Sequence, residues 1–338
     1  MSPSAPEAEV LVARASEILA RVRKAVSARL VGKTELVDGI LAAAVAEGHL
    51  LIEGVPGLAK TLAVRAFADA AGLQFRRVQF TPDLLPGDIT GTLYYDAPTG
   101  RFVPRKGPVF ANVVLADEIN RAPAKVQSAL LEAMEERQVT IGDSSLELPF
   151  PFIVLATQNP IEHEGTFRLP EAQLDRFMLK VKADYPSAAE EAEIVRLAAS
   201  SRDGGARRAP AAETVLTESD LGALRAALAA VRVDDAVLGY CVRLVRATRP
   251  DPAAPDPALR ELSRLVEYGA SPRASIVLHR AARVAALFAG RAWAGPDDVK
   301  AFALSALRHR VAPSYEAEAE GVDSDELVRR ILSIVPVP

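Results

Sequence analysis

The residues best suited to chemistry form the run Gly54-Val55-Pro56-Gly57-Leu58-Ala59-Lys60-Thr61. An apolar segment precedes this run, and a helical pattern begins at Leu62. A loop of this kind points successive backbone N–H groups and a helix N-terminus at an anion. Lys60 can then reach the outer phosphates of a nucleotide, and the Thr61 hydroxyl can bind Mg²⁺. Ala59 departs from the usual G-x-x-x-x-G-K-[ST] pattern, so the run alone also fits an ordinary strand–turn–helix corner.

A pair of acids follows the apolar segment 113–116. In open α/β sheets, ligands bind at the carboxyl ends of the strands, which is where Asp117 and Glu118 would lie. Asp117 can hold Mg²⁺, directly or through water, and Glu118 can orient and deprotonate an attacking water. The alternative is a strand that ends in a solvated acidic turn.

An amide and an arginine extend the same pattern. The apolar segment 152–156 ends in Thr157 and Asn159, and the Asn159 amide can hydrogen-bond the attacking water or a γ-phosphate. Asn-Pro is also a common turn pair. Arg176 follows a short helical segment just before the next apolar run. It can reach the γ-phosphate of a neighbouring subunit, a contribution of about 10³–10⁵ in rate, or it can be a surface arginine paired with an acid.

A second arginine stands where a helix begins. Ser271 can cap this helix, and Pro272 suits its first position. Arg273 then falls in the first turn, where the helix dipole disfavours a cation by roughly 0.3–1 kcal/mol. A nucleotide phosphate would remove that conflict, whereas a solvent-exposed arginine would simply tolerate it.

The composition sets the class of protein. The chain has 338 residues, 49% hydrophobic and 25% charged, with a net charge of −4 and one cysteine. These values exclude a disulfide framework and argue against a polyanion as the main partner. No apolar run approaches the about 18 residues of a membrane span, and no signal-peptide pattern is present. The four histidines have no metal-ligand spacing. We expect a cytoplasmic protein without a membrane span.

The order of apolar and helical segments predicts the domains. Residues 1–9 are expected to be disordered. Strand-like runs alternate with helical stretches up to residue 186, which predicts an α/β core over residues 10–186 with a parallel sheet and helices on both faces. Two β-hairpins are expected in it, at about 87–106 and about 138–150. Residues 187–338 are rich in Ala, Arg and Leu with helical periodicity, so an all-helical second domain is predicted.

Four segments carry a specific resemblance to a known family. They are Asp117-Glu118-Ile119-Asn120-Arg121-Ala122-Pro123, the run from Gln127 to Glu136, Ala156-Thr157-Gln158-Asn159-Pro160, and Leu169-Pro170-Glu171-Ala172-Gln173-Leu174-Asp175-Arg176-Phe177. Together they closely resemble the MoxR family of AAA+ ATPases. The loop 54–61 also resembles the Walker A loop of that family, including Ala59. The resemblance extends over roughly residues 10–338, and it implies an AAA+ P-loop αβα core followed by a helical lid.

The resemblance gives the matching residues their expected roles. It implies ATP and Mg²⁺ as cofactors, with the metal on Thr61 and Asp117. The residues expected to bind the nucleotide are Val31, Gly32, Gly54, Val55, Pro56, Gly57, Leu58, Ala59, Lys60, Thr61, Leu62 and Asp117. Those expected to act in catalysis are Lys60, Glu118, Asn159 as sensor 1, Arg176 as the arginine finger and Arg273 as sensor 2.

The implied function is ATP hydrolysis in a ring that remodels, matures or activates other proteins. We expect a hexamer, because Arg176 has no γ-phosphate to serve within its own subunit. A partner with a von Willebrand factor A domain and metal-cofactor insertion recur in the family. The first expected hairpin resembles the helix-2 insert of one AAA+ branch, which also includes nucleic-acid motors. A motor of this kind is one alternative, and residues 138–167 disfavour it because they contain no Lys or Arg. Arg101, Arg105 and Lys106 near the first hairpin weaken that objection. A second alternative is a nucleotide-gated assembly protein with little turnover, and the intact Asp117-Glu118 pair disfavours it.

Overall fold

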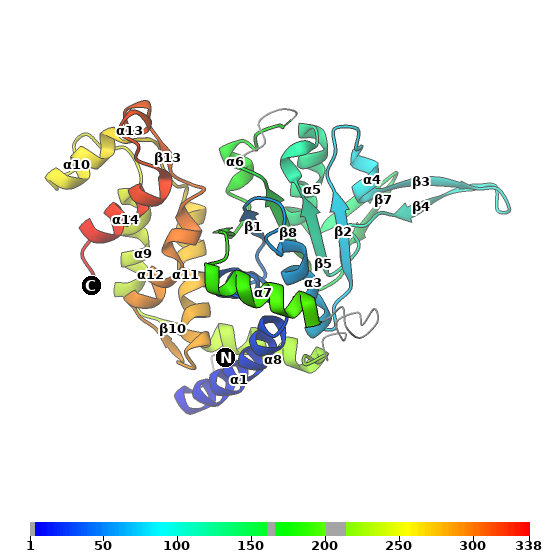
Figure 1. Ribbon diagram of the computed structural model, residues 1–338, viewed down its shortest axis with the longest axis horizontal. Coiled ribbons are helices and arrows are strands. Elements are labelled where there is room, and N and C mark those ends of the chain that lie inside the picture. The colour runs from blue at the N-terminus through cyan, green and yellow to red at the C-terminus, as the bar shows by residue number, and fades with distance from the viewer. Residues whose placement is uncertain (1–3, 161–165, 201–213) are drawn as a thin grey trace. The chain divides into compact units, whose positions relative to one another are not determined.

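The apolar runs form one parallel sheet in the computed structural model, which describes residues 4–160, 166–200 and 214–338. Its strand order is β2-β5-β8-β1-β9 (Figure 1). The strands are β1 (Leu50–Glu53), β2 (Phe75–Gln79), β5 (Val113–Asp117), β8 (Ile153–Gln158) and β9 (Leu179–Lys182). β5 is buried along its whole length, as is usual for a parallel strand covered on both faces.

The register brings the carboxyl ends of the strands to one edge. Gln79 of β2 lies opposite Asp117 of β5, and Glu53 of β1 lies opposite Gln158 of β8. β5 and β8 are parallel and in register up to the pair Ala116 and Ala156. The polar residues that follow β1, β5 and β8 therefore leave the sheet side by side. The predicted parallel α/β core is confirmed.

The chain divides into two compact units. The first, which we call the sheet unit, is Ala20–Leu169 with Val181–Glu218. The second, the helical unit, is Met1–Leu19 with Pro170–Lys180 and Ser219–Pro338. This division differs from the predicted boundary at residue 186. Residues 214–216 stay with the sheet unit because Val215 donates a hydrogen bond to the Ala70 carbonyl, at 2.9 Å.

Two helices pack against the sheet. α2 (Thr34–Val45) contacts β1 and β8, and α3 (Lys60–Ala70) contacts β2 and β5. The same part of the chain also contains α1 (Ala5–Ser27), α4 (Pro86–Thr90), the 3-10 helix η1 (Ile119–Arg121), α5 (Ala124–Glu136) and α7 (Ala188–Ser200).

The first helix begins earlier than the sequence predicted. α1 starts at Ala5, although disorder was expected through residue 9. Glu7 accepts hydrogen bonds from the Ser4 amide and hydroxyl, both at 2.8 Å, and Ala8 and Val12 are buried. A local cap and an apolar face therefore start the helix within the Pro-bearing segment. Residues 1–3 lie outside the described part of the chain.

Two β-hairpins extend the sheet unit. β3 (Gly91–Asp96) pairs antiparallel with β4 (Arg101–Lys106), and β6 (Gln138–Ile141) pairs with β7 (Ser144–Glu147). The first was expected from about residue 87, but residues 86–90 form α4 instead. Its strands are exposed over nearly all their residues, and Figure 1 shows the ribbon reaching away from the sheet.

The helical unit is built around α11, which packs against α9 and α12. Its helices are α6 (Glu171–Leu174), α8 (Glu218–Ala230), α9 (Asp235–Ala247), α10 (Pro257–Arg264), α11 (Pro272–Phe288), α12 (Pro296–Leu307), α13 (Tyr315–Ala319) and α14 (Ser324–Ile334). The sequence predicted helices alone. Two short strand pairs are also present, β10 (Arg232–Val233) with β12 (Trp293–Ala294) and β11 (Val266–Tyr268) with β13 (Ala312–Pro313). Strands of two or three residues are too short to show a period-2 pattern.

Among the described residues, none of the helices combines the length and the apolar character needed to cross a bilayer.

A buried histidine joins the sheet to α5. The Val154 amide donates to His49 Nδ1 at 3.0 Å, so Nε2 carries the proton and donates to the Met134 carbonyl at 3.2 Å. The Phe152 ring packs against the imidazole edge to face, with centroids 5.8 Å apart. Burial lowers the pKa of His49 to about 4, from an ordinary value of 6.5.

The neutral form of His49 makes folding sensitive to acid. Between pH 6.5 and about 4 the unfolded chain binds a proton at His49 that the folded chain does not. The free energy of unfolding is therefore undiminished by this histidine above pH 6.5 and decreases as the pH falls toward 4. The expected loss is roughly 2–3 kcal/mol. His49→Asn keeps an acceptor for Val154 and removes the titration. Urea unfolding across this range should show the stability advantage of wild type over the variant shrinking as the pH falls. A constant difference would contradict the assignment.

Candidate active site

The loop between β1 and α3 has the conformation of an anion-binding turn. Gly57 has φ +86°, and a Cβ added there would meet nothing within 4 Å, so its surface is open. Gly54 is closely packed, since an added Cβ would lie 2.7 Å from the Ala183 carbonyl oxygen. α3 begins at Lys60, whose Nζ donates to the Gly54 carbonyl. The loop therefore closes on itself just before a helix N-terminus.

Ala59 adopts the backbone conformation that normally selects glycine. Its φ of 58° and ψ of 18° are left-handed. This region costs an L-residue about 1–2 kcal/mol because Cβ approaches the following carbonyl oxygen. Glycine is usual at this place for that reason, and alanine, with the smallest side chain after glycine, is tolerated. The sequence showed the substitution but not the strain.

The two acids at the end of β5 are held by a hydroxyl on the neighbouring strand. Thr157 donates to Asp117 Oδ1 at 2.6 Å and accepts from the Glu118 amide at 2.8 Å. Thr157 and Asp117 are buried, while Glu118 is partly exposed. Glu118 also has a positive φ of 56°, which turns the chain sharply at the end of the strand. One hydroxyl thus orients the Asp117 carboxylate and fixes the backbone of Glu118.

Two residues of β2 that the sequence analysis missed bind the same acids. Arg77 donates to Asp117 Oδ2 through Nε and Nη2, at 2.9 and 2.6 Å. Gln79 donates to Glu118 Oε2 at 2.7 Å and accepts from Arg77 at 2.8 Å. Arg77 and Gln79 are two residues apart, so they share a face of the strand. Only the pairing of β2 with β5, which the sequence does not show, reveals this contact.

A third missed residue, Gln127 of α5, supports the turn after Glu118. It is fully buried, and its Nε2 donates to the carbonyls of Ile119 and Ala122, at 3.2 and 3.1 Å. A further bond at 3.2 Å reaches the Phe167 carbonyl. Gln127 lies in one of the segments that carries the family resemblance, which is the signal that could have found it.

The electrostatics connect the loop to the acids. Burial lowers the pKa of the half-buried Lys60, and the charges of Asp117 and Glu118 oppose that shift. Opposite charges favour the ammonium form when they lie close by. The loop lysine and the carboxylates at the end of β5 therefore share one electrostatic environment at the edge of the sheet.

The remaining predicted residues of the sheet unit begin a helix, follow a strand or lie in a turn. Thr61 is the second residue of α3, and Asn159 is buried directly after β8. Val31 and Gly32 precede α2. A Cβ on Gly32 would lie 1.8 Å from a Glu190 carboxylate oxygen, so this turn lies against α7.

The oxygen donors here suit Mg²⁺ better than a transition metal. A buried carboxylate, Asp117, and a helix-terminal hydroxyl, Thr61, are hard oxygen ligands. Mg²⁺ is usually bound by one or two carboxylates together with substrate phosphates. Across residues 4–160, 166–200 and 214–338, no group of three or more His, Cys, Asp or Glu gathers in a way that could hold a metal on its own. The residues present fit a Mg²⁺ that arrives with a nucleotide.

The two arginines expected to act on phosphates belong to the helical unit. Arg176 follows α6 directly after the capping residue Asp175, and it is half-buried. Arg273 is the second residue of α11 and is exposed. Ser271 caps this helix by accepting from the Arg273 amide at 3.1 Å, and Pro272 occupies the first position, as predicted.

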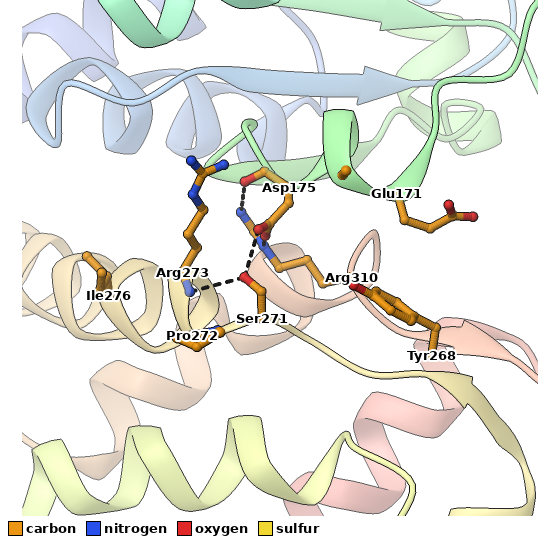
Figure 2. Close-up of a pocket in the computed structure, with 9 residues that line it drawn as sticks. Glu171, Asp175, Tyr268, Ser271, Pro272, Arg273, Ile276 and Arg310 are labelled. Carbon is orange, nitrogen blue, oxygen red and sulfur yellow. Dashed lines mark hydrogen bonds and ion pairs between the residues drawn. The ribbon is translucent and has the colours of Figure 1, made fainter.

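A buried ion pair lies beside these arginines. Arg310 Nε donates to Asp175 Oδ1 at 2.6 Å, and the Arg310 side chain is only 1% exposed. Removing one partner of such a pair costs about 3–5 kcal/mol. Asp175, Ser271, Arg273 and Arg310 line one side of a pocket of about 400 Å³ (Figure 2).

Comparison with known proteins places the chain among ATPases. The family described as "ATPase family associated with various cellular activities (AAA)" matches residues 49–179, and "AAA lid domain" matches residues 261–331. A crystal structure described as that of "a putative ATPase" from Cytophaga hutchinsonii superposes with a TM-score of 0.88 at 42% identity, and the match covers 98% of both chains. The fold and these matches place the chain in the AAA class of ATPases.

Two curated relatives narrow the class. "Chaperone MoxR1" of Mycobacterium tuberculosis is 46% identical over 310 residues, covering 91% of this chain and 79% of that protein. "Protein MoxR" of Methylorubrum extorquens is 33% identical and covers 94% of this chain and 95% of that protein. The chain belongs to the MoxR family of AAA+ ATPases.

The left-handed alanine allows a direct test of the loop. Ala59→Gly should leave stability within about 1 kcal/mol, because relief of strain offsets the greater entropy of the unfolded chain. Ala59→Val should destabilise by about 1–3 kcal/mol, since a β-branched residue is poorly tolerated at positive φ.

The midpoint of thermal unfolding measures both changes. Ala301→Val, at an exposed position inside α12, is the matched control and should cost only about 0.5 kcal/mol of helix propensity. Equal effects of valine at positions 59 and 301 would contradict the account of the loop.

Proposed function

We propose that the protein hydrolyses ATP at the carboxyl edge of its sheet. The observation that carries this proposal is that Asp117 and Glu118, held at the end of β5 by hydrogen bonds, interact electrostatically with Lys60 of the glycine loop. Phosphoryl transfer requires little besides such positioning and charge stabilisation. Membership of an ATPase family supports the same reaction.

The loop and the helix that follows it bind the triphosphate in this proposal. Backbone N–H groups of residues 54–62, apart from Pro56, cradle the phosphates. Lys60 stabilises the outer charges of the phosphates, and Val31 with Gly32 contacts the adenine side. Thr61 and Asp117 hold Mg²⁺, which neutralises charge on the phosphate oxygens when it is bound.

Glu118 acts as the general base. Its carboxylate accepts the proton of the attacking water, and Asn159 orients that water. In the structure Gln79 and Arg121 both donate to Glu118 Oε2, at 2.7 and 3.2 Å. These bonds orient the carboxylate, which makes Gln79 and Arg121 the positioning partners of the base.

Arg176 completes the site of a neighbouring copy, and Arg273 contacts a phosphate. This arrangement requires a closed ring, and we propose a hexamer. The ring uses ATP to remodel, mature or activate a protein client. The relative named "Chaperone MoxR1" supports that task. By family resemblance the partner is a protein with a von Willebrand factor A domain, the activation extends to metal-cofactor insertion, and the work takes place in the cytoplasm.

The role of Glu118 is tested by removing its charge alone. Glu118→Gln should still bind ATP, because the amide keeps the size of the side chain, but it should lower the rate of hydrolysis by about 10²–10⁴. Phosphate release and binding of a fluorescent ATP analogue give the two readouts. Glu132→Gln, at an exposed position on α5, is the control and should leave both unchanged. Hydrolysis at the wild-type rate in Glu118→Gln would refute the assignment.

The role of Arg176 is tested between subunits. Arg176→Ala should lose about 10³–10⁵ in rate because the transition-state charge is left unpaired. Mixing it with Glu118→Gln subunits, which retain Arg176, should restore hydrolysis, since each inactive variant supplies what the other lacks. Steady-state hydrolysis at several mixing ratios measures this. If no ratio exceeds the activity of the separate variants, Arg176 does not act in trans.

A further inference from the structure

Asp175 joins the predicted arginine finger to the helix that carries Arg273. Its backbone directly precedes Arg176, and its carboxylate has two partners in the rest of the helical unit. Oδ1 accepts from Arg310 at 2.6 Å, and Oδ2 accepts from the Ser271 hydroxyl at 2.7 Å. Figure 2 shows the carboxylate lying between these two side chains.

Arg310 forms hydrogen bonds with the backbone on both sides of Arg176. Its Nη2 donates to the carbonyls of Asp175 and Phe177, at 2.9 and 2.6 Å, and its Nη1 donates to the carbonyl of Met178 at 3.1 Å. A further bond joins Nη1 to Ala306 of α12. All three nitrogens of the guanidinium are used, and a rigid planar fork of this kind holds its acceptors in fixed positions. The backbone around Arg176 is therefore held against the end of α12.

Ser271 connects the same carboxylate to α11. Its hydroxyl oxygen accepts a hydrogen bond from the Arg273 amide at 3.1 Å, and the same hydroxyl donates a hydrogen bond to the Asp175 carboxylate. A shift of the first turn of α11 must therefore either move Asp175 or break this bond. Arg310 does not allow Asp175 to move without the residues that flank Arg176.

We propose that Asp175 is a positioning residue that couples the first turn of α11, with Arg273, to the placement of Arg176. When a phosphate binds Arg273 of one subunit, this contact changes the position of Arg176 in the same subunit. Arg176 is the residue that this subunit presents to its neighbour. The proposal rests on the trans role of Arg176 proposed above. Ser271 and Arg310 are the other members of the coupling.

A pair of substitutions separates the coupling from the helix cap. Asn and Asp both cap helices well and are almost equal in size. At position 271, the Asn amide can still donate to Asp175, whereas the Asp carboxylate has no proton to donate and repels it. Ser271→Asn should therefore preserve the coupling, and Ser271→Asp should break it. Ser314→Asp is the matched control, because Ser314 caps α13 in the same way at another place in the unit.

The test uses mixed rings in which the altered subunit has no hydrolysis of its own. One subunit carries Arg176→Ala and supplies working sites, and the other carries Glu118→Gln and supplies the finger. Each position-271 change is added to the Glu118→Gln subunit, so a lost rate reflects what that subunit contributes to its neighbour and not its own hydrolysis. Misplacing a reacting group by about 1 Å can cost about 10² in rate. We expect Ser271→Asp to lower the restored activity by roughly 10- to 100-fold, and Ser271→Asn and Ser314→Asp to leave it within about twofold.

Three results decide the question. Restored activity that is the same with Ser271→Asp as without it overturns the coupling while leaving the trans role intact. Mixed rings that fail even without a change at position 271 overturn the trans role, and the coupling with it. Asp175→Asn in the Glu118→Gln subunit is the second variant, should Ser271→Asp not assemble. It removes the charge but keeps an acceptor for Arg310, and it should also lower the restored activity; full complementation by it contradicts the proposal.

Discussion

The parallel register of β1, β5 and β8 is the constraint on which the candidate site depends. Because these strands end together, one edge of the sheet carries three groups of residues: the glycine turn after Glu53, the acids after Ala116 and the polar residues after Ala156. Each group arises from a different part of the chain, and no two of them would meet without this pairing. The buried apolar residues of β5 and β8 therefore contribute to function by fixing where the polar residues at the ends of these strands lie.

Hydrogen bonds then convert proximity into orientation. Thr157 holds both acids with one hydroxyl, and β2 supplies a second set of donors from its exposed face. The helical unit uses the same device at Asp175, where Arg310 and Ser271 share one carboxylate. In each case a carboxylate is held by groups from distant segments. A substitution at one hydrogen-bonding partner therefore changes the position of a reacting group that the substituted residue does not contact.

The sequence predicts whatever depends on neighbours along the chain. The loop 54–61, the acids at the end of β5, the cap at Ser271 and both hairpins follow from local spacing. Contacts set by strand order or by helix packing do not. Arg77 and Gln79 reach acids about 40 residues away, and Arg310 binds Asp175 across 135 residues of chain. The early start of α1 depends on the burial of Ala8 and Val12, which composition did not reveal.

The central claim is that ATP is hydrolysed at this edge with help from a second copy of the chain. Electron cryomicroscopy of assembled Glu118→Gln subunits with ATP and Mg²⁺ tests it most directly. The account predicts a closed ring in which the triphosphate lies along residues 54–61 and the Arg176 guanidinium of the adjacent copy lies within hydrogen-bonding distance of the γ-phosphate. Nucleotide bound along the loop with Arg176 of every neighbour turned away from it would contradict the account.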